Sequence, residues 1–448
     1  KGEPIQSTGT AFKNIGVIVI DDASKKIESN SLYEIKEDTA KDATVAAAAK
    51  VIVDRVNNEY GTKFATSKVE LNGAKAPNGN RDVETNNGDL ITDAMRWKVL
   101  QNKDGLTVNE DHVVAITNGG GIRAAIAKGD VTKKDINTVL PFGNTVAVVY
   151  VTGEQLLEAL EASTFSTPTA VGGFPQVSGI NFTIHTGKAY DKNDTTYPES
   201  TYYGPKTINR VVINSVNGKE FKANEVYAVV TNNFCAAGGD TYYAFKAASA
   251  QFDTGIPLDE AVMEYVTKEL KGVIGEQYAA PQGRILLNPF KDVKVSSWFG
   301  KYVIDLYNDG IINGTSATTY APNDTLTWAA ALKLLLVSHG DLKAADATGA
   351  DWSKNTIAKA AELGLVAADL DGTKAISRLE FCQVAAKLNK LAESKTESKF
   401  TDCTDGYVMA LVDAKVINGM TETTFEPAAS LTRAQIAKII YQLNLIEK

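Results

Sequence analysis

The chain has 448 residues, enough for about three domains, and its 44% hydrophobic and 22% charged residues are typical of a globular protein. The net charge of −8 argues against a nucleic-acid polymer as partner, and no apolar run is long enough for a transmembrane segment. Only three scattered histidines are present, and the three cysteines lack CxxC spacing, so neither a histidine-rich metal centre nor a disulfide framework is expected.

Residues 1–38 are expected to form a β segment, with strands at 14–21 and 27–35. Since an isolated two-stranded hairpin is marginal in water, we expect this segment to be the end of a larger domain absent from the chain. The Ala-rich stretch 39–61 follows and is predicted to be a connecting helix that ends at Gly61.

Residues 62–289 alternate strands and helices, which predicts an α+β or α/β domain. Short apolar strands are expected at 112–117, 145–151 and 226–231, each next to a loop rich in Gly, Asn or Phe. Thr152 and Gln155 have the spacing of a capping box, which predicts that a helix begins there.

Residues 290–448 carry internal repeats, each read as helix, loop and helix. Their register predicts an all-α bundle of three repeats at 290–340, 341–395 and 396–448. Trp298 falls in helical spacing with Tyr302 and Leu306, so it is expected in the core, as is its counterpart Trp352.

The repeats resemble S-layer homology modules. Phe290-Lys-Asp-Val293 returns as Phe400-Thr-Asp-Cys403, and the family's Thr-Arg-Ala-Glu motif appears as Leu431-Thr-Arg-Ala-Gln435. A degenerate copy is Ile376-Ser-Arg-Leu-Glu380, whereas the first repeat has Leu326-Thr-Trp-Ala329 and lacks the arginine.

This resemblance implies a bacterial protein that is extracellular, at the cell wall or S-layer surface, with a secondary cell-wall polysaccharide and S-layer neighbours as partners. Arginine offers a planar fork of donors to the carboxylate of a pyruvylated sugar, and a helix N-terminus also favours an anion. Arg378, Arg433 and Trp328 are the candidate polysaccharide-binding residues. The alternative is that the two arginines only cap or bridge helices.

The middle domain resembles the C-terminal, substrate-binding domain of 5′-nucleotidases. The motifs are Asn118-Gly-Gly-Gly-Ile-Arg123, Leu140-Pro-Phe-Gly-Asn-Thr145, Phe174-Pro-Gln-Val-Ser-Gly179, Thr231-Asn-Asn-Phe-Cys-Ala-Ala-Gly-Gly-Asp240 and the segment from Arg81 to Met95. Nucleotides or nucleosides are therefore the expected small-molecule partners.

The resemblance also implies roles for individual residues. Phe142 and Phe234 would sandwich the base, and Asp240 would accept hydrogen bonds from the ribose hydroxyls. The remaining candidates are Asn118 and Asn144 for the base edge, Arg81 and Arg123 for the phosphate, and Gly120 and Gly121 for close backbone approach. Alternatively, the phenylalanines are core aromatics, Asp240 and the glycines serve turns, and Arg81 has a structural role.

Hydrolysis in such nucleotidases belongs to an N-terminal metallophosphatase domain with two divalent metal ions, and residues 1–38 resemble its last strands. No catalytic residue, metal ligand or cofactor is expected within this chain itself. We therefore interpret the chain as the C-terminal part of a surface 5′-nucleotidase that grips the nucleotide and holds the protein to the wall. The alternatives are a non-catalytic surface or S-layer structural protein and, third, an adhesin that reuses the pocket.

Overall fold

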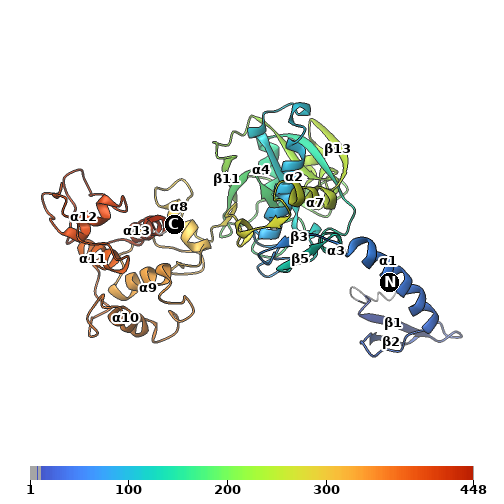
Figure 1. The fold of residues 1–448 in the computed structure, drawn as a ribbon, viewed down its shortest axis with the longest axis horizontal. Coiled ribbons are helices and arrows are strands. Elements are labelled where there is room, and N and C mark those ends of the chain that lie inside the picture. Colours follow the sequence, from blue (N-terminus) through green and yellow to red (C-terminus); the bar gives the residue numbers. More distant parts are fainter. Residues whose placement is uncertain (1–7, 9–11, 447–448) are drawn as a thin grey trace. The chain divides into compact units, whose positions relative to one another are not determined.

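The computed structural model describes residue 8 and residues 12–446 and separates the chain into two units, the second starting at Lys63 (Figure 1). The elements of the first unit are β1 (Asn14–Ile20), β2 (Ile27–Glu34) and α1 (Ala43–Tyr60). β1 and β2 form an antiparallel hairpin, and most of its apolar side chains are exposed. No residue of α1 is buried either, so the described part of this unit, residues 8 and 12–62, has apolar surface and no buried residue.

A five-stranded sheet organises the first part of the second unit, in the order β13-β6-β12-β4-β7. Its strands are β4 (Val113–Asn118), β6 (Thr145–Thr152), β7 (Pro175–Ser178), β12 (Val226–Asn232) and β13 (Ala250–Pro257). β12 is parallel to β4 and antiparallel to β6, while β7 is antiparallel to β4. The ends of β4 and β12 and the starts of β6 and β7 therefore meet at one end of the sheet.

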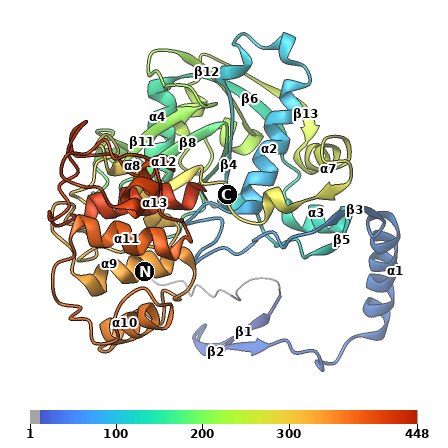
Figure 2. The ribbon, with the colours of Figure 1, turned by 60° about the vertical axis from the view of Figure 1, so that its left-hand side comes forward.

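Both faces of this sheet are covered by helices. Its helices are α2 (Asn86–Leu100), α3 (Lys133–Val139), α4 (Gly153–Ser163), α5 (Asn233–Ala236), α6 (Tyr243–Lys246) and α7 (Leu258–Lys268). In β4, Val113 and Ala115 pack into the core with α2 and α7, and Val114 and Ile116 into the core with α4. Figure 2 shows α2 and α7 on one side of the sheet and α4 on the other. The strand is buried on both faces, which is why it reads as a continuous apolar run.

Three smaller sheets complete this part of the second unit. Their strands are β3 (Lys63–Ser67), β5 (Gly129–Thr132), β8 (Ile180–Ile184), β9 (Lys192–Thr196), β10 (Tyr203–Pro205), β11 (Val211–Val216), β14 (Val273–Ile274) and β15 (Ile285–Leu287). β14-β3-β5 and β11-β8-β15 each form a three-stranded sheet, and β9 pairs with β10. The prediction of a mixed α/β domain is confirmed.

A buried acidic cluster holds the segment before β15 against α2. The Arg284 guanidinium donates to the Asp93 carboxylate at 2.8 Å, and the Ile285 N–H donates to Glu84 at 2.6 Å. Burial, followed by the negative charge of Glu84, raises the pKa of Asp89 to about 9. The neighbouring Glu84 also has a raised pKa because it is buried, so this pair of carboxyl groups retains a proton at neutral pH.

The chain from residue 290 is helical. Its helices are α8 (Gly300–Asn308), α9 (Trp328–His339), α10 (Trp352–Glu362), α11 (Arg378–Leu388), α12 (Gly406–Asp413) and α13 (Arg433–Ile446). Three isolated bridges, Thr325 with Thr432, Thr327 with Ala375 and Ser377 with Ser430, join the segments that lead into α9, α11 and α13. Each of these segments pairs with both others, so the bridges close a ring, which we call the bridge ring.

Candidate functional site

Four loops meet at the end of the five-stranded sheet described above. Gly119–Gly121 follows β4, and 140–144 precedes β6. The segment from Gly172 to Phe174 precedes β7, and 233–240 follows β12. The strand directions alone therefore place these four motifs at one end of the sheet, although up to 122 residues separate them in the chain.

Asp240 is held in place by the strand ends. The Asn118 side-chain amide donates to Asp240 Oδ2 at 2.8 Å. The Asn118 Oδ1 in turn accepts a hydrogen bond from the Asn232 side chain at 3.0 Å. Asp240 has a φ of +51°, in the left-handed region that Asp tolerates better than most residues. Burial raises the pKa of its carboxyl group, against the Asn118 hydrogen bond and the positive charge of Arg81, which lower it.

The glycines after β4 are packed against other backbone. The Gly119 N–H donates to Phe174 O and the Gly120 N–H to Gly172 O, both at 2.7 Å. A Cβ added at Gly120 would lie 2.9 Å from Gly172 O, whereas one at Gly121 would lie 3.2 Å from the Asn118 side chain. Gly120 is thus required for the close turn, which agrees with the turn alternative for this residue.

The two candidate arginines lie in different surroundings. Arg123 donates to Gly120 O at 3.2 Å, and its guanidinium lies 5.5 Å from the centre of the Phe142 ring. Arg81 is near enough to Asp240 for its charge to act on that carboxyl group, and its Nε is buried without a hydrogen-bond partner. One positive charge therefore lies beside Phe142 and another acts on Asp240.

Both candidate phenylalanines are exposed to solvent. The exposed fractions are 58% for Phe142 and 46% for Phe234, which argues against core aromatics. Their loops are joined, since the Asn144 side-chain amide donates to Asn233 Oδ1 at 2.7 Å. A Cβ at Gly239 would lie 2.5 Å from the Phe234 ring, so the ring packs directly against the glycine and no larger residue fits there without moving it.

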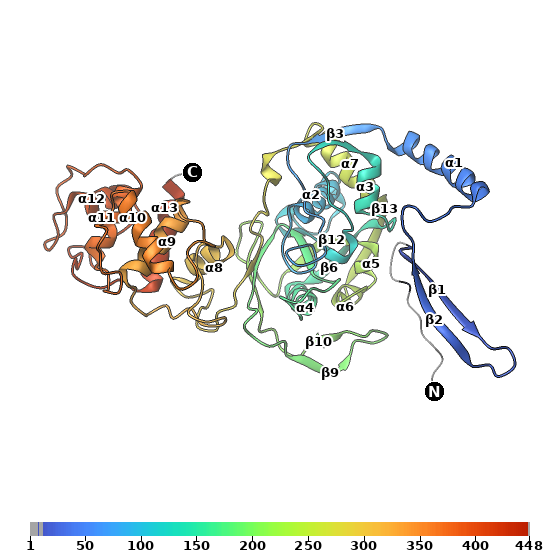
Figure 3. The ribbon, with the colours of Figure 1, turned by 90° about the horizontal axis from the view of Figure 1, so that it is seen from below.

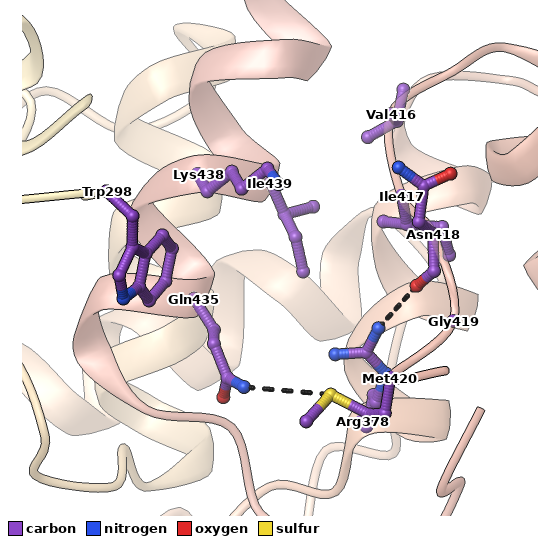
Figure 4. Close-up of a pocket in the computed structure, with 10 residues that line it drawn as sticks. All are labelled: Trp298, Arg378, Val416, Ile417, Asn418, Gly419, Met420, Gln435, Lys438 and Ile439. Atoms are coloured by element: carbon purple, nitrogen blue, oxygen red, sulfur yellow. Dashed lines mark hydrogen bonds between the residues drawn. The ribbon is translucent and has the colours of Figure 1, made fainter. Parts of the chain in front are cut away.

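A second site lies in the helical region, in a pocket of about 160 Å³ around Arg378 (Figure 4). The Arg378 guanidinium donates to Asn418 O at 2.7 Å and lies 4.6 Å from the centre of the Phe425 ring. Burial lowers the pKa of Arg378. The residue is only 7% exposed, and it lines the pocket. Gln435 and Lys438 of α13 line the opposite side.

Arg433 has a similar setting one repeat away, although its Nε donates a hydrogen bond while the Nε of Arg378 has no partner among the described residues. Its guanidinium donates to Asn313 O at 2.8 Å and to Tyr320 O at 2.7 Å, and lies 4.5 Å from the Tyr320 ring centre. Gly314 and Gly419 both sit where a Cβ would collide with backbone carbonyls, at 2.4 Å and 2.3 Å. The two Asn-Gly loops are therefore equivalent supports for the two arginines.

Trp328 stands at the third equivalent position but in a different setting. Its N–H donates to Lys374 O at 2.9 Å, and its side chain is partly buried against the helical core. The loop of the second repeat reads Val366-Ala367-Ala368 where the other two read Ile-Asn-Gly. The first repeat thus lacks the arginine and the second repeat lacks the Asn-Gly pair.

The prediction that Trp298 belongs to the core is wrong. Its side chain is 58% exposed and lines the Arg378 pocket. Trp298 lies two residues before this helix, because α8 begins at Gly300 after a turn in which Gly300 N–H donates to Ser297 O. Lys438 was also missed, although its position five residues after Arg433 places it on the same helix as the motif.

The described part of the chain, residues 8 and 12–446, contains no group of three or more His, Cys, Asp or Glu side chains arranged to hold a metal ion. In the same residues, no helix is both long and apolar enough to span a bilayer.

Comparison with known proteins agrees with this arrangement. Residues 63–247 match the family model of the 5′-nucleotidase C-terminal domain, and residues 289–331 and 402–437 match the S-layer homology domain. The matched S-layer homology stretches lie in the first and third repeats. Such domains indicate a location at the cell surface or cell wall.

Several curated proteins are similar to the chain. It is 33% identical over 290 residues to the trifunctional nucleotide phosphoesterase YfkN of Bacillus subtilis, which covers 63% of this chain and 17% of that protein. It is 28% identical over 269 residues to the 5′-nucleotidase of Vibrio cholerae, covering 58% and 41%. The chain thus spans less than half the length of these relatives.

Among solved structures, a 5′-nucleotidase precursor from Thermus thermophilus shares 30% identity, with 61% of this chain and 50% of that chain covered and a TM-score of 0.43. The family models carry the assignment: the chain contains a 5′-nucleotidase C-terminal domain followed by S-layer homology domains.

Proposed function

We propose that the loops at the end of the five-stranded sheet bind the nucleoside part of a nucleotide. The observation that carries this proposal is the pair of exposed rings, Phe142 and Phe234, on two loops joined by Asn144 and Asn233. Exposed aromatic rings next to a positioned carboxylate suit a planar base and a ribose. In this proposal the rings stack on the base and Asp240 accepts from the ribose hydroxyls.

The contacts divide the polar residues by role. The Asn118 side chain donates to Asp240 through its nitrogen and accepts from Asn232 through its oxygen. Both groups are therefore occupied, which supports a role in positioning Asp240 in place of contacting the base. The side-chain carbonyl of Asn144 accepts no hydrogen bond from the described residues, so we assign the base edge to Asn144. Arg123 and Arg81 supply positive charge for the phosphate.

Calorimetric titration of the full chain with adenosine tests this site. Base stacking contributes about 1–3 kcal/mol per ring, so Phe142→Ala and Phe234→Ala are each expected to weaken binding by about 5- to 150-fold. Phe252→Ala is the matched control, because this ring is also exposed, at 44%, but lies on β13. Equal losses in all three variants would refute the pocket, as would an absence of binding by the unaltered chain.

We further propose that hydrolysis is performed by a two-metal domain outside the described residues. The exposed apolar side chains of the β1–β2 hairpin support this, because a hairpin gains stability by packing against more strands. The described residues supply no ligand set for the two metals, so no hydrolytic step is assigned to them. Two such metals would activate a water and neutralise phosphoryl oxygens.

The corresponding experiment incubates this chain with AMP and Mn²⁺ or Mg²⁺. We expect no phosphate release above that of a boiled sample. Release that scales with protein concentration, and that persists after a second purification step, would contradict the proposal and place the reaction in this chain.

For the helical region we propose binding of an acidic secondary cell-wall polysaccharide in the grooves of Arg378 and Arg433. A pyruvyl ketal carries a carboxylate, which a guanidinium recognises with two parallel hydrogen bonds. Lys438 adds a second positive charge to the Arg378 pocket, and Trp298 adds an apolar face for a sugar ring. S-layer neighbours would then be further partners at this surface.

Co-sedimentation with purified sacculi tests the anchor. The chain is expected to bind intact sacculi and to lose at least about tenfold in affinity once the polysaccharide has been extracted. Arg378→Gln should weaken binding, whereas Arg55→Gln on the exposed helix α1 should not. Equal binding to intact and extracted sacculi would rule out polysaccharide recognition, and circular dichroism checks that Arg378→Gln is folded.

A further inference from the structure

The two ends of the loop that carries Phe142 are fixed in the domain. This loop, residues 140–144, connects the end of α3 to the start of β6. At its first end, α3 packs beside α7 (Figure 3) and buries Val139 in the core that also contains Leu258 of α7. At its second end, the Leu258 N–H donates to Asn144 O at 2.8 Å. Both ends of the loop are therefore attached to α7.

The Phe142 ring lies between these attachments and is not buried by them. Phe142 is 58% exposed, and the next residue, Gly143, has a φ of +63°, which glycine adopts readily in a tight turn. Among the described residues no other ring stacks on Phe142, and one cation lies over it, the Arg123 guanidinium at 5.5 Å from the ring centre. An exposed side chain loses freedom on binding a ligand unless a neighbour already holds it.

Arg123 is itself held at its backbone and at its side chain. Its N–H donates to Val139 O at 2.9 Å, which ties it to the last residue of α3, directly before the loop. Its guanidinium donates to Gly120 O at 3.2 Å, in the turn after β4. The Gly120 N–H is bonded to Gly172 O, which fixes that turn. The guanidinium therefore links a fixed turn to the exposed Phe142 ring.

This contact is suited to holding an exposed ring. A guanidinium near the face of an aromatic ring is attracted by the negative charge of the ring's π electrons. Arginine keeps its charge at physiological pH, and its planar group can stack on an aromatic face. One face of the ring is enough for this contact, so the opposite face remains for a base.

We propose that Arg123 is a positioning residue for base stacking, whose guanidinium holds the Phe142 ring in place before the nucleoside binds. This inference rests on the proposed nucleoside site. It gives Arg123 a role in binding that does not depend on a phosphate group.

The test measures adenosine binding by the full chain with ligand-observed NMR, which also follows weak binding. Adenosine has no phosphate with which Arg123 could pair. Arg123→Gln removes the cation and should weaken binding by about two- to tenfold, the cost of ordering one side chain on binding. Arg123→Lys keeps a cation and should restore most of the affinity. Lys128→Gln is the matched control, because Lys128 is exposed on the same segment and contacts no ring among the described residues.

A double-mutant cycle shows whether Arg123 acts through the ring. Phe142→Leu keeps an apolar side chain but removes the ring, so adding Arg123→Gln should not weaken adenosine binding further. The same loss with and without the ring would overturn the proposal, because Arg123 would then act on the base or on the fold. An equal loss in Lys128→Gln, or no recovery in Arg123→Lys, would also overturn it.

The outcomes separate the two proposals. If the unaltered chain binds adenosine and Arg123→Gln binds it equally well, the positioning role is overturned and the nucleoside site stands. Tighter binding by Arg123→Gln has the same consequence, because the guanidinium would then occupy the place of the base. No adenosine binding by the unaltered chain overturns both.

Discussion

At the scale of single residues, small or buried neighbours position the exposed side chains of the proposed nucleoside site. Asn118 holds Asp240 through one end of its amide and is itself held by Asn232 through the other. Gly239 positions the Phe234 ring, because any side chain at residue 239 would collide with that ring. The exposed rings and carboxylate are thus positioned by small or buried neighbours.

Gly239→Ala is expected to push the Phe234 ring outward, because the new Cβ would lie 2.5 Å from the ring. Since this ring is half exposed it can move, so the melting temperature should change by no more than about 2 °C. Adenosine binding should weaken by about tenfold, as for a lost stacking contact. Gly105→Ala is the control, because a Cβ there meets no atom within 4 Å. A variant that binds adenosine normally would show that the ring position is unimportant.

At the scale of elements, much of the arrangement could be predicted from the sequence. The three apolar runs became β4, β6 and β12, and the expected capping box of Thr152 and Gln155 is confirmed at the start of α4. These signals are local, since they depend on strand periodicity and on side chains three residues apart.

Other features depend on contacts that no local pattern contains. Asn118 and Asp240 are 122 residues apart, so their hydrogen bond follows only from the sheet order. The sequence did not indicate the β9–β10 strand pair, because β9 is polar and fully exposed, without the alternation of a half-buried strand, and β10 has only three residues. Trp298 was misplaced because helical spacing does not reveal where a helix begins.

The junction after β15 gives a pH-dependent prediction for an element. His185, next to β8, accepts a hydrogen bond at Nδ1 from Asn288, whose amide also donates to Val293 O. Burial, aided by the positive charge of Lys188, lowers the pKa of His185 to about 4 from 6.5. Protonation therefore favours the unfolded chain, and the free energy of unfolding should fall as the pH drops from about 6.5 to about 4.

His185→Asn keeps an acceptor for Asn288 but cannot titrate. Its urea midpoint should therefore fall less between about pH 7 and about pH 4.5 than that of the unaltered chain. Identical pH slopes in the two proteins would show that another group controls acid stability.

At the scale of the whole molecule, the two units differ in how they bury apolar surface. The second unit has extensive cores on both faces of its main sheet and in its helical region, whereas α1 of the first unit buries no residue. We therefore expect the stability of the second unit not to depend on the first unit.

Removing residues 1–62 is expected to leave the melting temperature within about 2 °C and to reduce the fluorescence of bound ANS, because the exposed apolar side chains of the hairpin are lost. Differential scanning calorimetry and dye titration measure the two effects. A fall in melting temperature of more than about 5 °C would mean that the second unit needs the first.

The bridge ring gives the helical region a cooperativity that open repeat arrays lack. In a linear array each repeat touches only its neighbours, so the end repeats fray and stability grows gradually with length. Here the segments at Thr325, Ala375 and Ser430 belong to three different repeats, and the pairs close on themselves. The bridge ring has no terminal segment at which unfolding can start. Losing any one of its three segments breaks two pairings at once. The region should therefore melt in a single step, and one groove can diverge in sequence, as at Trp328, while the other two keep their geometry.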